Sequence, residues 1–314
     1  MPAATSPSVT VLAGGVGAAR LLTGMVLAVP PAAVTAVVNT GDDLVLHGLA
    51  ISPDLDTVTY TVAGAIDPER GWGLRDESWQ AMATLERYGG ATWFGLGDRD
   101  LGTHLYRTQR LAEGASLATV TGEIARAWGL ELTVLPVTDD PLRTMITLAD
   151  TGEEVGFQDY FVGRQHAVPV SGVRFAGAEA AAAGPGVLAA IGRATTVVVA
   201  PSNPIVSIGP VLAVPGVRAA VEARRESVVA ISPLVGGRAL KGPADRLLRE
   251  LGHEDSVAGI ARLYAPLAGT LVIDRVDADR AGDVRAAGLR CVVTDTIMRD
   301  PAAAAALCGA ALGL

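Results

Sequence analysis

Two groups of residues near the N-terminus have the types and spacing to bind a phosphate and a metal ion. Gly14, Gly15 and Gly17 follow a short apolar run and open a helix-like segment. Glycines at such a point let backbone N–H groups approach a phosphate, and a helix N-terminus favours negative charge. The alternative is a tight turn needed only for packing. Arg20 replaces the third glycine of a dinucleotide-binding fingerprint, which argues against ordinary NAD binding.

Four carboxylates form the second group. Asp42 and Asp43 follow Asn39 and the glycine at position 41, and Asp54 and Asp56 lie a few residues further on. Carboxylates two positions apart point the same way on an extended backbone. Mg²⁺ favours one or two carboxylates together with substrate phosphates, so Asp42 with Asp54 and Asp56 would suit this ion. The alternatives are a solvated turn at Asp42-Asp43 and a helix N-cap by Asp54 or Asp56.

Two further polar motifs follow later in the chain. Arg99 stands between two aspartates, where it would be held for phosphate contact unless the motif is only a surface ion-pair cluster. Ser202, Asn203 and Ser207 follow an apolar strand-like run, at the edge of the sheet where open α/β proteins bind ligands. A loop around Lys241 follows another strand, and its simpler interpretation is a helix cap.

The elements that must position these motifs alternate between strand and helix patterns. Near-continuous apolar runs are separated by helical segments, as in a mostly parallel sheet that is covered on both faces. We therefore predict a Rossmann-like, doubly wound α/β fold. Residues 1–66 and 164–314 would form the core. Residues 67–163, which carry all four tryptophans, would form a largely helical insertion that acts as a cleft wall or lid. The expected strands are Val9–Leu12, Val34–Val38, Leu132–Val137, Val197–Ala200, Val228–Ile231, Leu271–Ile273 and Cys291–Val293.

Composition excludes several classes of protein. A net charge of −8 without a basic stripe disfavours nucleic-acid binding. Two cysteines cannot form a disulfide framework, and both are expected to be inert core thiols. The first eight residues do not resemble a signal peptide, and the longest uncharged run is interrupted by proline and glycine. We expect a cytoplasmic enzyme with no membrane partner.

Taken together, the motifs resemble the 2-phospho-L-lactate transferase family of coenzyme F-420 biosynthesis, from about Val9 past Asp295. The actinobacterial branch, called phosphoenolpyruvate transferase, is the most similar, because the runs that start at Asp67 and Trp93 are typical of it. The motifs are V-T-V-L-A-G-G-V-G at Val9, V-V-N-T-G-D-D at Val37, S-P-D-L-D-T at Ser52, D-P-E-R-G-W-G at Asp67, W-F-G-L-G-D-R-D at Trp93 with T-H at Thr103, and A-P-S-N-P-I-V-S-I-G-P at Ala200.

The resemblance implies a reaction between two small molecules. The acceptor is the deazaflavin alcohol Fo, and the donor is a guanosine diphosphate ester of phosphoenolpyruvate or 2-phospho-L-lactate. The products are dehydro-coenzyme F-420-0 or F-420-0, together with GMP. Members of the family use Mg²⁺ and are typically homodimers. Which three-carbon acid is transferred depends on cleft side chains that the sequence does not place.

The chemistry that the resemblance implies assigns roles to the candidate residues. Asp42 with Asp54 or Asp56 would hold Mg²⁺ on the diphosphate, and one of these carboxylates or Asp43 would accept the hydroxyl proton. The remaining substrate contacts are expected from Gly14, Gly15, Gly17 and Asn39 near the phosphates, from Arg99 and Trp72 near the deazaflavin, and from Ser202, Asn203 and Ser207 near the guanosine.

Two other functions compete with this hypothesis. A sister group in the same superfamily consists of nucleotide-sugar-binding regulatory proteins, which share the glycine-rich start but are not expected to carry both P-D-L-D-T and G-D-R-D-x-x-T-H. A nicotinamide dehydrogenase is disfavoured by Arg20 and by the acidic residues.

Overall fold

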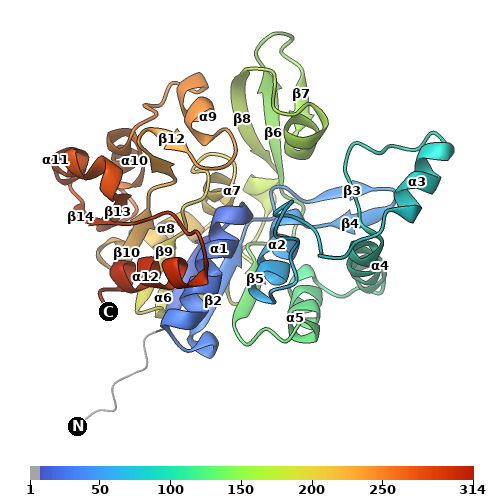
Figure 1. Ribbon diagram of the computed structural model, residues 1–314, viewed down its shortest axis with the longest axis horizontal. Helices are drawn as coiled ribbons and strands as arrows, with labels where there is room; N and C mark the ends of the chain where they lie inside the picture. Colours follow the sequence, from blue (N-terminus) through green and yellow to red (C-terminus); the bar gives the residue numbers. More distant parts are fainter. Residues whose placement is uncertain (1–7) are drawn as a thin grey trace.

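A seven-stranded parallel sheet forms the centre of the computed structural model, which describes residues 8–314 (Figure 1). Its strands are β1 (Val9–Ala13), β2 (Val34–Val38), β5 (Thr133–Pro136), β9 (Thr196–Val199), β10 (Val228–Ile231), β13 (Thr270–Asp274) and β14 (Arg290–Thr294). Their order is β14-β13-β10-β9-β1-β2-β5, and every neighbouring pair is parallel. All seven expected strands are present, and the predicted doubly wound α/β fold is confirmed. Apart from Ser8, the stretch that we predict not to be a signal peptide lies outside the described residues.

Helices cover both faces of this sheet. One face packs against α1 (Gly15–Ala28), α2 (Pro53–Val62), α5 (Leu117–Ala127) and α12 (Pro301–Leu312). The other packs against α6 (Val187–Arg193), α7 (Ile208–Ala213), α8 (Val217–Glu222), α10 (Val257–Tyr264) and α11 (Ala281–Ala286). Side chains along a strand alternate between faces, so Val11 and Ala13 of β1 enter the first core while Leu12 enters the second. Within the described chain, no helix combines the length and apolar character needed to span a bilayer.

Smaller elements surround the end of the sheet where the strands terminate. Hairpin β3 (Leu44–Leu46) with β4 (Leu49–Ile51) extends to the side of the sheet with α3 (Gln80–Arg87) and α4 (Asp98–Ala112) (Figure 1). An antiparallel sheet has the order β7-β6-β8, and another pairs β11 with β12. The strands of these two small sheets are β6 (Arg143–Leu148), β7 (Glu154–Gly156), β8 (Val170–Ala176), β11 (Leu234–Val235) and β12 (Arg238–Ala239). The remaining helix is α9 (Ala244–Glu250). The short helical turns are η1 (Pro31–Ala33), η2 (Asp159–Gly163), η3 (Ala178–Ala180), η4 (Arg225–Ser227) and η5 (Arg275–Arg280).

The segment 67–163 is less separate from the core than its helical patterns suggest. It contributes α3, α4 and α5, but its strand β5 pairs with β2 at the edge of the large sheet. Its strand β6 pairs with β8, which comes after this segment. The helical part that stands apart from the sheet therefore ends before α5, which packs on a face of the sheet. Movement of this part as a lid stays a prediction.

The strand order places a ligand-binding crevice beside β1. The chain runs from β1 outward to β2 and β5 on one side, and returns to β9, β10, β13 and β14 on the other. Such a reversal separates the loops at the carboxyl ends of two neighbouring strands, here β1 and β9, and ligands of open α/β proteins bind in the gap between them. The glycine turn follows β1, and the Ser202 loop follows β9.

Candidate active site

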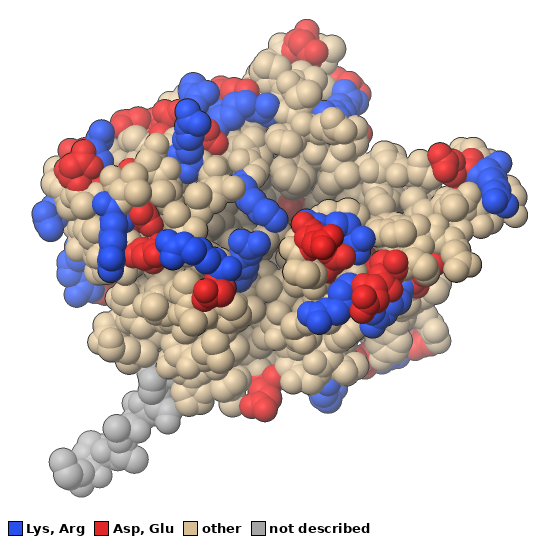
Figure 2. Space-filling model, in the orientation of Figure 1, with Lys and Arg blue, Asp and Glu red and all other residues tan. Residues whose placement is uncertain are grey.

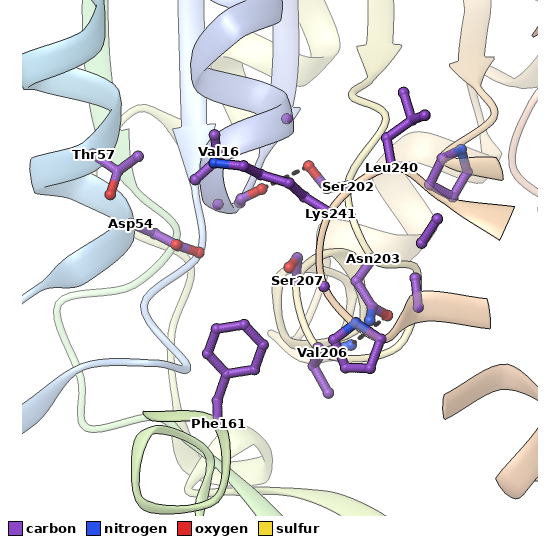
Figure 3. Close-up of a pocket in the computed structure, with 18 of the residues that line it drawn as sticks. Val16, Asp54, Thr57, Phe161, Ser202, Asn203, Val206, Ser207, Leu240 and Lys241 are labelled. Atoms are coloured by element: carbon purple, nitrogen blue, oxygen red, sulfur yellow. Dashed lines mark hydrogen bonds between the residues drawn. The ribbon is translucent and has the colours of Figure 1, made fainter. Parts of the chain in front are cut away.

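A cavity of about 660 Å³ lies at this crevice. The glycine turn, the start of α2, the Ser202 loop, the turn before α9 and the helical turn η2 form its wall, and Figure 3 shows their side chains facing a shared space. A cavity of this volume accommodates a ligand of drug-like size. The predicted site residues on its wall are Gly14, Gly15, Gly17, Asp42, Asp54, Trp72, Ser202, Asn203 and Ser207.

The glycine turn needs glycine at each of its three positions. Gly15 has φ +68°, in the left-handed region that other residues rarely adopt. A Cβ on Gly14 would lie 2.8 Å from the Cβ of Ser207, and one on Gly17 would lie 2.6 Å from the carbonyl oxygen of Pro201. No side chain caps the start of α1, so its first amides, apart from the Gly15 amide that faces Asp54, are available to an anion.

Asp54 lies directly against this turn. Its Oδ2 would be 3.1 Å from a Cβ on Gly14. The Nδ2 of Asn39 donates to the same oxygen at 2.9 Å, while the Asn39 Oδ1 accepts from the Gly41 amide at 2.7 Å. Burial raises the pKa of Asp54 to about 6, against the lowering effects of Asn39 and the Gly15 amide. Asn39 is itself fully buried, so it orients Asp54 and does not lie on the cavity wall.

Asp42 is buried and Asp43 is half-buried, and both lie near Asp54. Burial first, and then the charge of Asp54, raises the pKa of Asp42 well above its usual value. Burial also raises the pKa of Asp43 to about 8, although Ser52 donates to it at 2.8 Å. One oxygen of each, Oδ1, is buried without a hydrogen-bond partner. Asp42 lines the cavity, whereas Asp43 lies behind it.

Asp56 is not on the cavity wall, contrary to the expectation that it would act beside Asp54. The two residues occupy the first turn of α2, and on a helix positions two apart face different directions. Asp54 therefore faces the glycine turn, and Asp56 forms a buried ion pair with Arg107 of α4. The second Arg107 nitrogen, Nη1, donates to the Asp56 Oδ2 at 3.1 Å.

Asp56, Asp100 and His104 form a second buried acidic group in which a metal ion could be held. One ligand atom from each lies within 4.8 Å of the others. The His104 Nε2 is 3.3 Å from Asp100, and the Tyr60 hydroxyl donates to Asp100 at 2.7 Å. Because Arg107 already neutralises Asp56, a cation would compete here with a permanent positive charge. The Asp56–Asp100–His104 group therefore has fewer unpaired negative charges for a cation than the Asp42–Asp54 pair has.

Arg99 does not reach the cavity. It is exposed on α4, where its Nη1 donates to the carbonyl oxygen of Arg75 at 2.7 Å and its amide donates to Glu77 at 2.7 Å. Arg99 therefore fits the alternative interpretation of a local surface cluster. Trp72, by contrast, is on the cavity wall and packs edge-on against Trp79, with ring centroids 6.0 Å apart.

The residues after β9 hold the glycine turn in place. The Ser202 hydroxyl donates to the carbonyl oxygen of Gly14 at 2.6 Å. The Asn203 Oδ1 accepts from the Ile205 amide at 2.9 Å, so this oxygen stabilises its own loop. The Asn203 amide nitrogen and the Ser207 hydroxyl are the groups that can address a ligand, and Figure 3 shows both residues at the cavity.

The sequence matches the family of the 2-phospho-L-lactate transferase CofD over residues 9–304. The chain belongs to the CofD family. It is 44% identical over 310 residues to the phosphoenolpyruvate transferase of Streptomyces griseus, covering 98% of each chain. It is 41% identical to the phosphoenolpyruvate transferase of Mycolicibacterium smegmatis over 320 residues, again covering 98% of each chain. The family resemblance predicted from the motifs, including its actinobacterial branch, is confirmed.

A solved structure shares the fold of this CofD family member at low sequence identity. A Bacillus halodurans protein of the UPF0052 family superposes with a TM-score of 0.62 at 16% identity, over 97% of this chain and 99% of the other. At that identity the likeness supports the fold alone. The chain is thus a transferase by family and has the doubly wound architecture that the strand pattern predicts.

Several cavity residues of this CofD family member escape sequence reasoning. Thr57 follows Asp56 on α2, and Phe94 comes from the loop before α4. Phe161 belongs to the π-helical turn η2 and stacks on Phe157 at 5.3 Å and on His166 at 5.0 Å. Single π-helical turns often mark functional sites, but no local sequence pattern announces this one. His166, to which the sequence assigns no role, thus belongs to the aromatic part of the wall.

The positively charged residues on the wall were also missed. Arg20, Arg70 and Lys241 line the cavity from three separate segments. Arg20 enters the sequence argument only as a departure from the NAD fingerprint, and Lys241 only as part of a capping loop. Arg20 lies one turn after Gly17 on α1, so its position on the same helix face was a usable signal.

Proposed function

We propose that this protein transfers the phosphoenolpyruvate or 2-phospho-L-lactate group from its guanosine diphosphate ester to the ribityl hydroxyl of the deazaflavin Fo. The products are dehydro-coenzyme F-420-0 or F-420-0, and GMP. One observation carries the proposal: Asp54 lies against the glycine turn, and Asp42 lines the same cavity beside it. Membership of the CofD family and the activity for which its relatives are named support the proposal.

Mg²⁺ suits the Asp42–Asp54 pair. Two buried carboxylates repel each other, their pKa values are raised, and one oxygen of Asp42 has no partner. A divalent cation would offset this charge, and Mg²⁺ accepts one or two carboxylates beside substrate phosphates. When bound, Mg²⁺ supplies charge neutralisation at the diphosphate. Asp56, held by Arg107, is not part of this set.

The side chains of the cavity perform the remaining work of positioning and proton transfer. The amides of the glycine turn bind a phosphate, and the Ser202 hydroxyl fixes the carbonyl that precedes them. The Fo hydroxyl attacks the phosphorus that bears the three-carbon acid, the bond to the GMP oxygen breaks, and Asp42 accepts the hydroxyl proton. Burial raises the pKa of Asp42, which makes its carboxylate a stronger base than an exposed aspartate. Phosphoryl transfer requires little covalent catalysis by the protein, so most of the catalysis comes from positioning the substrates and neutralising charge.

The aromatic wall suits the planar deazaflavin. Trp72, Phe94 and Phe161 line the cavity with Asp42, which brings the acceptor ring beside the proposed base. The guanosine would then lie toward Asn203 and Ser207, as the family resemblance implies. The position of the ring is tested by measuring how strongly the Trp72→Ala variant and the unchanged protein each quench the fluorescence of Fo.

The direct test is a reaction with defined substrates. Purified protein, Fo and Mg²⁺ are mixed with each guanosine diphosphate ester in separate and competing reactions, and deazaflavin products are separated by chromatography. We expect a new fluorescent product and an equal amount of GMP from at least one ester. Absence of product from both, with binding of a nucleotide sugar instead, would favour the regulatory alternative. Light scattering tests the homodimer that the resemblance implies.

A further inference from the structure

Two cationic side chains on the cavity wall have no acidic partner. Arg70, the third cation there, pairs with Asp67 at 2.8 Å and donates to the carbonyl oxygen of Leu74 at 3.1 Å. Within residues 8–314, neither Arg20 nor Lys241 has a carboxylate within salt-bridge distance or an acceptor for a side-chain hydrogen bond. Arg70 is therefore occupied by the protein itself, whereas Arg20 and Lys241 are free for a ligand.

Arg20 and Lys241 converge although they come from distant parts of the chain. The charge of Arg20, after burial, contributes to lowering the pKa of Lys241, which requires the two groups to be close. The Lys241 Nζ would lie 2.7 Å from a Cβ on Gly71, so the lysine reaches across to the segment that carries Arg70 and Trp72. Figure 3 shows Lys241 directed over the first turn of α1, between Asp54 and Ser202. Two like charges brought together at a cavity favour an anion between them.

The proposed donor has one anionic group that the other residues do not address. Its diphosphate is met by the amides of the glycine turn and by the metal at Asp42 and Asp54. Its carboxylate belongs to the three-carbon acid on the transferred phosphorus, only a few bonds from the phosphate at the glycine turn. A cationic group within reach of that turn is therefore required, and Arg20 on α1 is placed there.

We propose that Arg20 and Lys241 bind the carboxylate of the transferred three-carbon phospho-acid. This inference rests on the proposed function and names the part of the donor that these two residues recognise. Both are binding residues: they hold the acid while its phosphorus passes from GMP to the hydroxyl, and no bond to either forms or breaks. An arginine–carboxylate contact is directional, and lysine adds a point charge from the opposite wall.

The test compares Arg20→Gln and Lys241→Gln with Arg238→Gln. Arg238 is exposed on β12, three residues before Lys241, and does not line the cavity, so its variant removes the same charge from the same loop. For each protein, kcat and KM are measured for the donor and for Fo with Mg²⁺ present. The dissociation constant of GDP, which carries the diphosphate and guanosine without the three-carbon acid, is measured by calorimetry. Thermal unfolding confirms that each variant is folded.

We expect each cavity variant to lower kcat/KM for the donor by about tenfold to a hundredfold, the effect of losing one charged hydrogen bond. The KM for Fo and the affinity for GDP should stay within about twofold, as should every constant of Arg238→Gln. If GDP affinity falls as much as donor kcat/KM, the two residues bind the diphosphate and the proposal is overturned. Unchanged donor kinetics in an active enzyme also overturn it. If the unaltered protein makes no product from either ester, the proposed function fails first, and this inference fails with it.

Discussion

Asn39 links the end of β2 to the start of α2, because its Nδ2 donates a hydrogen bond to the Oδ2 of Asp54 at 2.9 Å. The Asn39 Oδ1 is fixed in turn by the Gly41 amide, so the amide group cannot rotate without losing both bonds. Asp42 lies three residues after Asn39, and hydrogen bonding by Asn39 acts to lower the pKa of both Asp42 and Asp54, so this buried amide lies beside both cavity carboxylates. Asn39 orients a carboxylate without lining the cavity, whereas Asp42 and Asp54 line it, so substitutions at Asn39 and at Asp42 can test the two roles separately.

Replacing Asn39 by Ala should affect activity and stability together. The change leaves the Gly41 amide and Asp54 without their partner, and an unsatisfied buried polar group costs about 1–3 kcal/mol. Asp54 would lose its fixed direction, so we expect kcat to fall by about tenfold or more. Urea unfolding and steady-state kinetics measure the two effects. A variant with unchanged kcat would show that Asn39 does not orient the site.

Asp42→Asn should remove activity without unfolding the protein. Loss of a group that neutralises charge or takes a proton in the transition state costs about a hundredfold or more in turnover. Because Asp42 is a buried carboxylate near Asp54, its replacement by a neutral isostere relieves repulsion and should not lower the unfolding temperature. Asp150→Asn, at an exposed turn, is the control for loss of one acidic charge. Full activity of Asp42→Asn in Mg²⁺ would refute the role.

The large sheet could be predicted from the sequence because buried parallel strands are short, apolar and rich in Val. Val197–Val199 and Val228–Ile231 are fully apolar in sequence and almost fully enclosed in the structure. The sequence does not predict the antiparallel strand Arg143–Leu148, because its burial alternates but its polar and apolar residues, R-T-M-I-T-L, do not. The buried Thr144 interrupts the two-residue period, so this strand has no clear sequence signal.

Part of the site was predictable and part was not. The glycine turn and Asp42 were identified correctly as cavity residues because motifs at strand ends meet at one edge of a parallel sheet. Asp56 lies off the cavity wall because the backbone is helical here and not extended; Pro53 at the first helical position and two acids in the first turn favour this helix start. Lys241 comes from an irregular loop and Phe161 from the π-helical turn η2, and no local sequence pattern encodes their approach to the cavity.

The Asp56–Arg107 ion pair should matter for stability more than for chemistry. Replacing Asp56 by Asn leaves the buried Arg107 charge without its partner, and such a change costs about 3–5 kcal/mol. We expect the free energy of unfolding to fall by this amount in urea titration. The folded fraction, assayed at low temperature, should keep kcat within about tenfold. A far larger loss of kcat with an unchanged free energy of unfolding would show that Asp56 takes part in the chemistry.

Without divalent cations, stability should fall as pH rises. The folded-state pKa is about 6 for Asp54 and about 8 for Asp43, both raised first by burial, against an unfolded value of 3.8. Between these values the folded protein binds more protons than the unfolded chain, so the free energy of unfolding decreases from about pH 4 to about pH 8, by a few kcal/mol. Thermal unfolding in chelator across this range measures the slope.

Mg²⁺ and an Asp54 variant provide the controls for this pH dependence. A cation that binds ionised Asp42 and Asp54 competes with protons, so it should raise the unfolding temperature more at pH 8 than at pH 5.5. Asp54→Asn removes one titrating group and should flatten the slope between pH 4 and 6. A slope of opposite sign in the unaltered protein would show that these carboxylates are ionised in the folded state without metal.

Gly17→Ala tests whether the glycine turn must lie against the Ser202 loop. The added methyl carbon would stand 2.6 Å from the carbonyl oxygen of Pro201, a backbone atom that can yield only if the loop moves. That movement would disturb the Ser202 bond to the Gly14 carbonyl and the amides that face the phosphate. We expect donor KM to rise at least tenfold, because misplaced amides lose charge-assisted bonds to phosphate.

The matched control for Gly17→Ala is Gly102→Ala. Gly102 lies within α4, where a Cβ would meet no atom within 4 Å. Alanine there should raise the free energy of unfolding by about 0.5–1 kcal/mol, because it limits the unfolded chain and favours helix. Its kinetics should be unchanged. If both alanine variants bind donor as tightly as the unaltered protein, the glycine turn does not cradle the diphosphate, because an intruding carbon at 2.6 Å from Pro201 cannot leave those amides in place.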